Sequence, residues 1–197
     1  MFCLTRFIQS VVSAVAVLLL AVSCSNPSEN GFTLKGRCTD SSYKSALFLA
    51  ENGQVADSVS IQESEFGFIV EQVPAVPEIS VVRLLNPDDA ENFVDLPVGI
   101  ENGVAKLVFG ERFTLSGTPL NEKIMLFLHS MSDLRAEATS PERNMDIESI
   151  AGEFSKLYCN YIVLNADNAL GHYIYRQYGS HLSEQDLATA TSALNKK

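Results

Sequence analysis

Hydrophobic and polar residues alternate along the chain from Phe32 to about Ser116. In the first run, the non-polar positions Phe32, Leu34 and Gly36 alternate with the polar positions Thr33, Lys35 and Arg37. Such alternation places one face of a strand in a core and the other in water. The pattern predicts strands at residues 32–38, 45–51, 54–61, 65–71, 78–86, 92–101, 104–110 and 112–116. Because no helix-length segment separates these runs, we expect a mostly antiparallel sandwich or open barrel.

Two features of this region make more specific predictions. The third run places a set of alternate residues on one face, namely Val55, Asp57, Val59 and Ile61. The dipeptides Asn52-Gly53 and Asn102-Gly103 predict tight hairpins, because Asn-Gly accepts the positive φ of a type I′ turn.

After Gly117 the hydrophobic period becomes that of a helix. Thr118 is the expected N-cap of a first helix, with Pro119 at the first helical position. The apolar stripes of the first two helices are predicted at Leu120, Ile124, Phe127, Met131 and Leu134, and at Ile147, Ile150, Phe154, Leu157 and Tyr161. Start signals for the second, third and fourth helices are Ser140-Pro141, Asp167 and Ser183, the last with Asp186 placed as in a capping box.

Together these patterns predict an α+β fold. We expect an antiparallel β-sandwich-like domain over residues 32–117, followed by a small C-terminal helical subdomain over residues 118–197.

Residues 1–23 have the pattern of a lipoprotein signal peptide. Arg6 supplies positive charge, and the apolar run from Val11 to Val22 is too short to span ~30 Å of hydrocarbon as a permanent helix. The sequence Leu20-Ala21-Val22-Ser23-Cys24 resembles the lipobox of bacterial lipoproteins. That resemblance implies cleavage between Ser23 and Cys24 and a diacylglycerol on the Cys24 thiol. The alternative is an ordinary secretory signal with a chance cysteine near its cleavage site.

Residues 24–31 are expected to form a lipidated tether. The turn-forming composition from Ser25 to Gly31 is typical of a flexible linker. Two or more acyl chains on Cys24 would give a lasting membrane anchor. Because Ser25 rather than Asp comes immediately after Cys24, the resemblance to Gram-negative lipoproteins and their sorting rules favours the outer membrane. We therefore expect a cell-envelope protein held to the membrane by lipid.

The chain carries 14 basic and 24 acidic side chains, a formal charge of −10. This balance argues against a nucleic-acid partner, because no basic stripe is available to displace counterions from phosphates. Removal of the signal takes away Arg6 and no acidic residue. Net charge alone therefore predicts that the folded body is held off anionic lipid headgroups.

The two cysteines of the folded region, Cys38 and Cys159, leave two interpretations open. They could pair as a disulfide in an oxidising periplasm, or they could be two separate, inert and part-buried thiols. The sequence contains no Cys-x-x-Cys, which makes a redox-active role less favoured still.

No catalytic, metal or cofactor site is predicted from the remaining residues. His129 has Asp133 one helical turn away, but His129, His172 and His181 lack the spacing of a metal site, so we expect surface roles. Acidic residues in the predicted turns are typical of solvated loop tips, namely Glu63, Glu65, Asp88 and Asp89. A set of tyrosines could stack on a sugar ring or a peptide, or could rim the core: Tyr158, Tyr161, Tyr173, Tyr175 and Tyr178.

Several short motifs, taken in order, resemble one family. They are Phe32-Thr33-Leu34-Lys35-Gly36, Val55-Ala56-Asp57-Ser58, Phe66-Gly67-Phe68, Ile100-Glu101-Asn102-Gly103, Leu115-Ser116-Gly117-Thr118-Pro119-Leu120-Asn121 and Asn165-Ala166-Asp167-Asn168-Ala169-Leu170-Gly171. Residues 32–190 resemble the N-terminal domain of unknown function that precedes the thioredoxin-like domain in TlpA-type lipoproteins of Bacteroidetes-like bacteria. Because this sequence has no Cys-x-x-Cys, the family's thiol–disulfide activity is not carried over.

These observations favour a lipid-anchored envelope protein that binds rather than catalyses. We expect it to dock another envelope protein or a nutrient-derived ligand. One alternative, motivated by the resemblance and by Cys38 and Cys159, is an accessory subunit of a periplasmic thioredoxin-like redox system. A second alternative is a hydrolase with an unrecognised site.

Overall fold

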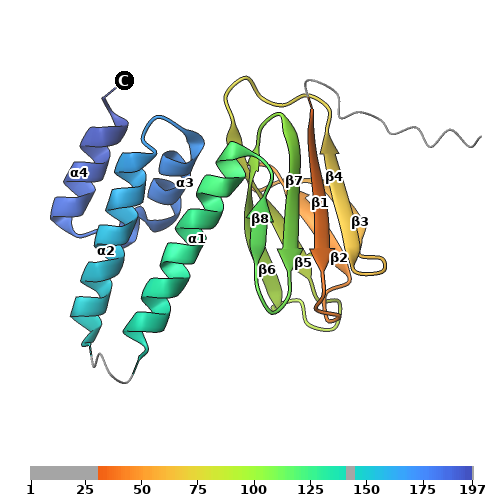
Figure 1. Cartoon of the computed structure of the whole chain (residues 1–197), viewed down its shortest axis with the longest axis horizontal. Helices are drawn as coiled ribbons and strands as arrows, with labels where there is room; N and C mark the ends of the chain where they lie inside the picture. Colours follow the sequence, from red (N-terminus) through yellow and green to blue (C-terminus); the bar gives the residue numbers. More distant parts are fainter. Residues whose placement is uncertain (1–30, 141–144, 197) are drawn as a thin grey trace, which may run out of the picture.

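The computed structural model describes residues 31–140 and 145–196, and its strands precede its helices along the chain (Figure 1). The strands are β1 Phe32–Cys38, β2 Ser45–Leu49, β3 Val55–Ser60, β4 Glu65–Val70, β5 Glu78–Leu85, β6 Phe93–Ile100, β7 Gly103–Phe109 and β8 Thr114–Ser116. The helices are α1 Pro119–Ala138, α2 Ile147–Leu164, α3 Ala169–Tyr178, the 3-10 turn η1 Gly179–His181, and α4 Glu184–Leu194. This α+β order confirms the predicted fold class.

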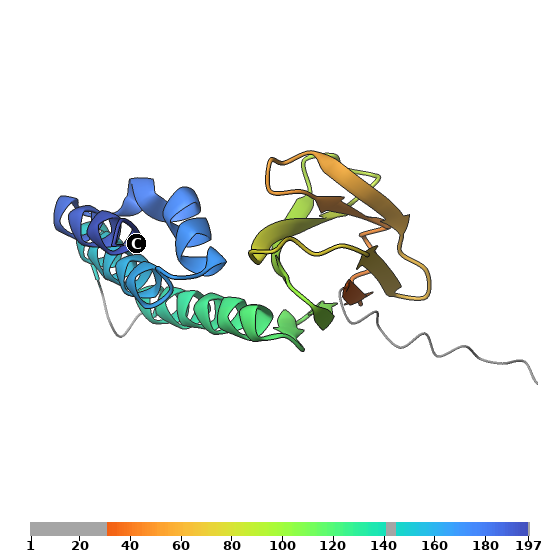
Figure 2. The same ribbon diagram turned by 90° about the horizontal axis from the view of Figure 1, so that it is seen from above.

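The strands form two four-stranded sheets that face each other, with the helices to one side (Figure 2). The strand orders are β4-β1-β7-β8 and β3-β2-β5-β6, and every pairing is antiparallel except β1 with β7. Alternate residues of both sheets point into the core, among them Phe32, Leu34, Phe68, Val82, Leu84 and Val98. The predicted sandwich is confirmed, and its two layers meet at contacts such as Phe48 with Phe68, whose ring centroids lie 5.3 Å apart.

Of the two predicted hairpins, one is confirmed and one is wrong. Asn52-Gly53 joins the antiparallel pair β2 and β3, with Gly53 at a φ of +80°. Asn102-Gly103 instead carries the chain from one sheet to the other, because β6 and β7 belong to different sheets. Gly103 has a φ of +132°, its N–H donates to the carbonyl of Gly31, and β7 then runs parallel to β1. Glycine adopts a positive φ readily, both in hairpins and in connections between two sheets such as this one.

The predicted buried face of the third run is confirmed at its end and wrong at its start. β3 is an edge strand paired only with β2, and Val55 is 58% exposed while Val59 is half-buried. Val59 and Ile61 are half-buried and pack against the core, whereas Asp57 is exposed together with Val55 near the start of this edge strand.

The helical subdomain corrects the predicted stripe of α2. Buried residues of this helix are Ser155, Tyr158, Cys159 and Ile162, whereas Ile147 is 85% exposed. α2 packs against α1 and also against α3 and α4, so the predicted stripe from Ile150 to Tyr161 is only half-buried. In α1 the prediction holds at Leu120, Ile124 and Phe127, which are buried.

The predicted helix starts are confirmed for α1 and α4, and the predicted start of α3 is wrong by one residue. Thr118 occupies the N-cap of α1, but its hydroxyl accepts from Asn121 and caps no backbone N–H. The third helix is capped by Asn168, whose side chain accepts from the N–H of Leu170, rather than by Asp167. α2 begins after its N-cap Asp146 rather than at Ser140, and Pro141, the other residue of the predicted start signal, lies outside the described residues. The N-cap Ser183 of α4 is confirmed.

Polar contacts fix the helices against the sandwich. The buried amide of Asn121 donates to the carbonyl of Gly99 at 2.9 Å and accepts from the Gly99 N–H at 2.8 Å, which joins α1 to β6. A side chain at Gly99 would meet Leu120 at 2.6 Å, so only glycine permits this approach. An exposed ion pair of 2.6 Å between Arg176 and Glu51 joins α3 to the β2–β3 turn.

Candidate functional site

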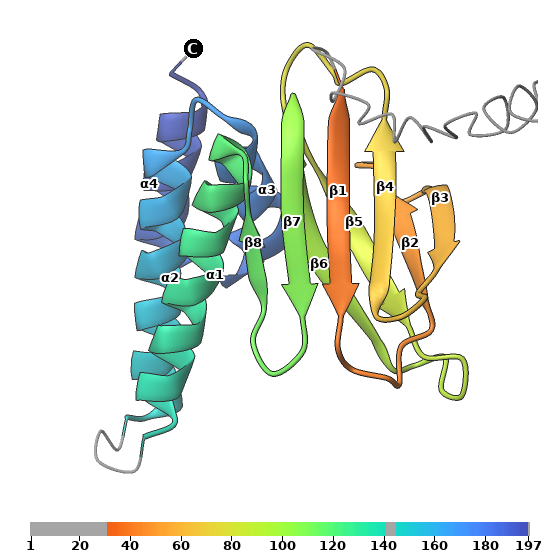
Figure 3. The ribbon, with the colours of Figure 1, turned by 45° about the vertical axis from the view of Figure 1, so that its right-hand side comes forward.

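The outer face of the sheet β4-β1-β7-β8 is open, with no described helix over it (Figure 3). A shallow hollow of about 660 Å³ extends over β4, β1 and β7. Gly67 forms part of its floor, opposite Lys35 in the register of β1 and β4. Ile69, which is 72% exposed, and Val108 lie on the same face.

Three cations gather on this open face. Lys35 and Lys106 are direct partners in the register of β1 and β7, and Arg37 lies two residues along β1. Glu65 is opposite Arg37 across β1 and β4, but in the part of the chain that the structure describes no ion pair reaches any of the three cations. Like charges opposite each other destabilise a sheet. The open face is therefore suited to an anionic surface or ligand.

In the other sheet, β3-β2-β5-β6, the cation Arg83 has a carboxylate partner. Arg83 on β5 makes two hydrogen bonds of 2.7 Å to the carboxylate of Asp95 on β6, and its guanidinium lies 4.3 Å from the ring centroid of Phe93. This contrast shows that the fold can supply a carboxylate partner on a sheet face. The cations Lys35, Arg37 and Lys106, which we call the basic cluster, have no such partner among residues 31–140 and 145–196.

A second hollow, of about 620 Å³, lies in the helical subdomain between α2 and the segment Tyr178–Ser183. Its wall is aromatic: Tyr158 and Tyr178 stack with centroids 4.6 Å apart, and Phe154 packs on Tyr158 at 5.9 Å. His181, Ser180 and Glu148 give it a polar rim. Gly152 also lines it, and a Cβ built there meets nothing within 4 Å. We call this hollow the aromatic pocket.

The five tyrosines that the sequence singled out lie in different surroundings. Tyr158 and Tyr178 form the pocket wall, and burial raises the pKa of each hydroxyl. Tyr161 and Tyr175 are tied into the helix packing instead, through hydrogen bonds with Ser130 and Thr191. Tyr173 lies in a smaller hollow beside Glu51 and Arg176, where burial raises its pKa to about 12.

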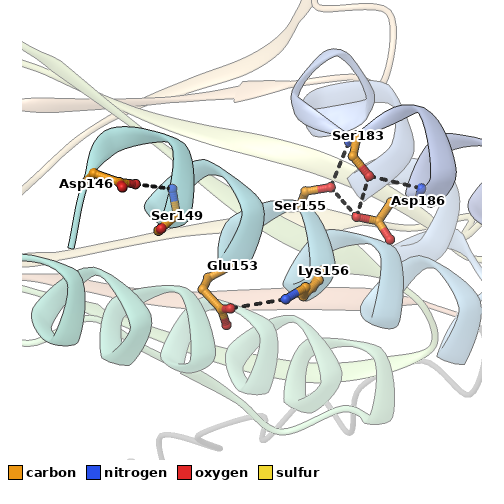
Figure 4. Close-up of polar contacts among 7 residues, drawn as sticks. All are labelled: Asp146, Ser149, Glu153, Ser155, Lys156, Ser183 and Asp186. Carbon is orange, nitrogen blue, oxygen red and sulfur yellow. Dashed lines mark hydrogen bonds and ion pairs between the residues drawn. The ribbon is translucent and has the colours of Figure 1, made fainter. Parts of the chain in front are cut away.

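A hydrogen-bond network fixes the base of the aromatic pocket (Figure 4). The hydroxyl of the buried Ser155 donates to the Asp186 carboxylate, and it accepts from the Ser183 N–H at 2.8 Å. Ser183 Oγ donates to the same carboxylate at 2.8 Å and accepts from the Asp186 N–H at 3.2 Å. These bonds satisfy the start of α4 and hold it against α2, and one oxygen of the Asp186 carboxylate accepts from both hydroxyls, so the network is structural.

Cys38 and Cys159 are free thiols in separate places. Cys38 is buried at the end of β1, and Cys159 is buried on α2, where its thiol donates to the carbonyl of Asp186 at 3.5 Å. Burial raises the pKa of both thiols, and the Asp40 and Asp186 carboxylates add to this effect at Cys38 and Cys159 respectively. The structure thus corresponds to the second interpretation of the sequence, two separate buried thiols.

The remaining predicted residues do not converge. His129 and Asp133 are both exposed on α1, His172 lies by the small hollow, and His181 lies at the aromatic pocket. Across the described ranges, no three His, Cys, Asp or Glu side chains come close enough to hold a metal ion. Sequence reasoning missed the basic cluster, although the alternation in β1 already placed Lys35 and Arg37 on its polar face.

Ser23 and Cys24, the predicted cleavage and lipidation residues, lie outside the described residues. Within residues 31–140 and 145–196, no helix has both the length and the apolar character needed to cross a bilayer. In comparisons with known proteins, we found no family model, no curated protein and no solved structure that matches the chain. The resemblance to the domain of TlpA-type lipoproteins therefore stays a prediction.

Proposed function

We propose that this chain is a lipid-anchored envelope protein that works as a non-catalytic binding module, with the aromatic pocket as its ligand site. The observation that carries the binding role is the pocket itself, a hollow of about 620 Å³ with a stacked aromatic wall. Ligand sites of this kind combine apolar and aromatic walls with a few polar groups.

The ligand class follows from the lining. Aromatic rings give an apolar surface to the C–H face of a sugar, and the polar rim of Ser180, His181 and Glu148 offers hydrogen bonds to its hydroxyls. We therefore propose a carbohydrate, in agreement with a nutrient-derived ligand at the cell envelope. Phe154 and Tyr178 are half-buried, so part of each ring remains available for contact.

The anchor is supported by the sequence around Cys24. The lipobox-like segment Leu20 to Cys24, the short apolar run before it and the polar segment Ser25 to Gly31 occur in the order that a tethered lipoprotein needs. An accessory redox role has weaker support, because a buried thiol with a raised pKa is a poor nucleophile.

Gly152 offers a direct test of the pocket. Because a Cβ there meets open space, Gly152→Arg should fill the hollow without disturbing the core, and Gly152→Ala is the matched control that adds only a methyl group. We expect saturation-transfer NMR with a panel of neutral oligosaccharides to give signal for the native protein and for Gly152→Ala, and to lose it for Gly152→Arg.

Two results would contradict the proposal. One is an absence of saturation transfer from the native protein to every oligosaccharide of the panel. The other is transfer that persists unchanged in Gly152→Arg, which would place carbohydrate binding outside the aromatic pocket.

A further inference from the structure

We infer that the basic cluster docks the folded body onto anionic lipid headgroups, so that the open face of β4-β1-β7-β8 lies on the membrane. This inference rests on the proposed lipid anchor. It adds a defined orientation, set by Lys35, Arg37 and Lys106, to a body that the anchor alone would leave free to turn.

The place where the tether joins the fold brings this face to the membrane. The segment Ser25 to Gly31 connects Cys24 to Phe32, the first residue of β1, and its seven residues span at most about 25 Å when fully extended. β1 is also the strand that carries Lys35 and Arg37. Lys35 is the fourth residue after Gly31, where the tether ends, so the anchor would hold lipid phosphates close to these cations.

The charge of the face differs from that of the whole chain. The chain has a formal charge of −10, but charges further than about 8 Å are largely screened at physiological ionic strength. Within that distance the sheet register places Lys35, Lys106 and Arg37 together, with Glu65 as their neighbour on β4. The expectation that net charge holds the body off the membrane therefore does not apply to this face.

The shape of the face also suits a membrane surface. Gly67, the partner of Lys35 on β4, has no side chain that could cover Lys35. The hollow over β4, β1 and β7 is shallow. Ile69 and Val108 are exposed beside the cations. Basic residues mixed with exposed apolar side chains are typical of surfaces that rest in the headgroup region. Seen from above, α1 slopes away from this sheet and leaves it accessible (Figure 2).

A lipid occupant is favoured over a soluble anion by the anchor itself. A tether converts the contact with headgroups into an intramolecular event with a high effective concentration. Three exposed cations bind a free anion weakly, but next to an anionic bilayer each cation shifts the docked-to-undocked ratio by about fivefold.

The test places a fluorophore on the face of the intact lipoprotein. Ile69→Cys and Ile147→Cys replace two exposed isoleucines, one on the open face and one on α2, and the native Cys38 and Cys159 are buried. Each purified lipoprotein is labelled with an environment-sensitive dye and reconstituted into phosphatidylcholine vesicles with or without 30% phosphatidylglycerol. Sedimentation reports the anchor, and dye emission reports docking.

We expect both vesicle types to carry the protein, and only the dye at position 69 to shift to blue emission on anionic vesicles. The shift should be lost when Lys35, Arg37 and Lys106 are all changed to Gln. It should remain in a control with the same change at three exposed lysines elsewhere, Lys44, Lys123 and Lys196. The docked-to-undocked ratio should fall by about 100-fold for the cluster variant, as three factors of about five predict.

Other outcomes would contradict either the lipid anchor or the docking of the sheet face. Protein that fails to sediment with either vesicle contradicts the anchor, and so the proposed function. Sedimentation with equal emission on both vesicle types overturns the docking alone, as does an equal shift at position 147. A shift at position 69 produced by soluble glycerol phosphate without anionic vesicles would assign the cluster to a soluble ligand and overturn the membrane as its occupant.

Discussion

Two serines are buried to nearly the same degree but differ in their bonding. Ser80 on β5 is 1% exposed, and its hydroxyl has no hydrogen-bond partner in the described part of the chain. Ser155 on α2 is 2% exposed and joins the Ser183 N–H to the Asp186 carboxylate. A buried polar group without a partner costs free energy, whereas removing one partner of a bonded group leaves the other unsatisfied.

The same substitution should lower the stability at Ser155 but not at Ser80. We expect Ser80→Ala to leave the free energy of unfolding unchanged or raise it by about 1 kcal/mol, and Ser155→Ala to lower it by about 1–3 kcal/mol. Urea denaturation measures both. An equal loss in the two variants would contradict the hydrogen-bond assignment.

The thiols carry a second residue-scale prediction. Because burial raises the pKa of Cys38 and Cys159, neither should react with a thiol reagent at pH 8 in the folded protein, and both should react after denaturation. Labelling with iodoacetamide followed by mass spectrometry checks this. A mass two hydrogens lower than that of the dithiol would instead establish a disulfide.

Tyr173 makes a pH-dependent prediction. Its pKa is raised to about 12, first by burial and then by repulsion from Tyr178, while an unfolded tyrosine titrates near 10. Between pH 10 and 12 the folded protein therefore binds more protons at this site, so stability is constant below pH 10 and falls as the pH rises through about 12. The ultraviolet difference titration of native protein against Tyr173→Phe should have its midpoint near 12. A midpoint near 10 would contradict the burial of this hydroxyl.

At the scale of elements, the joint between β6 and α1 depends on one side chain. Asn121 satisfies both backbone groups of Gly99 and also donates to Thr118 at 2.7 Å. This explains in physical terms why an asparagine follows the Thr118-Pro119-Leu120 start of the helix. The side-chain amide bonds the N–H and C=O of Gly99 as a neighbouring strand would. Gly99 lies next to Ile100, where the pairing of β6 with β5 ends.

Asn121→Leu should therefore weaken the joint more than the same change on the surface. It removes three hydrogen bonds and leaves the Gly99 N–H and C=O buried without partners, so we expect a loss of about 2–4 kcal/mol. Asn160→Leu, at an exposed position of α2, is the control and should change stability by less than about 0.5 kcal/mol. Thermal unfolding measures both. Equal melting temperatures would show that Asn121 does not carry the joint.

Sequence patterns predicted the elements well and their partners poorly. Alternation located the eight strands that the structure describes, because the core sets the period of two within a strand. It could not show that Asn102-Gly103 changes sheets, since a strand's partner depends on residues far along the chain. For the same reason the polar face of β1 was visible, but its alignment with Lys106 was not. The stack of Tyr158 on Tyr178 required the packing of two helices.

On the scale of the whole molecule, the two candidate surfaces lie in different halves. The basic cluster is on the sandwich, on the strand that begins next to the proposed tether, and the aromatic pocket is in the helical subdomain at the other end of the molecule (Figure 1). The buried joint at Asn121 and the Arg176–Glu51 ion pair connect the two halves. Docking of the sheet face on the membrane would thus hold the aromatic pocket at a set position relative to the bilayer.

The lipid anchor on Cys24 predicts that the chain incorporates palmitate. The full chain is expressed in a Gram-negative host with labelled palmitate, beside Cys24→Ser and the control Cys3→Ser, which changes a cysteine within the predicted signal. We predict that label and membrane sedimentation are both retained in Cys3→Ser and both lost in Cys24→Ser. Unchanged labelling and sedimentation of Cys24→Ser would contradict the account.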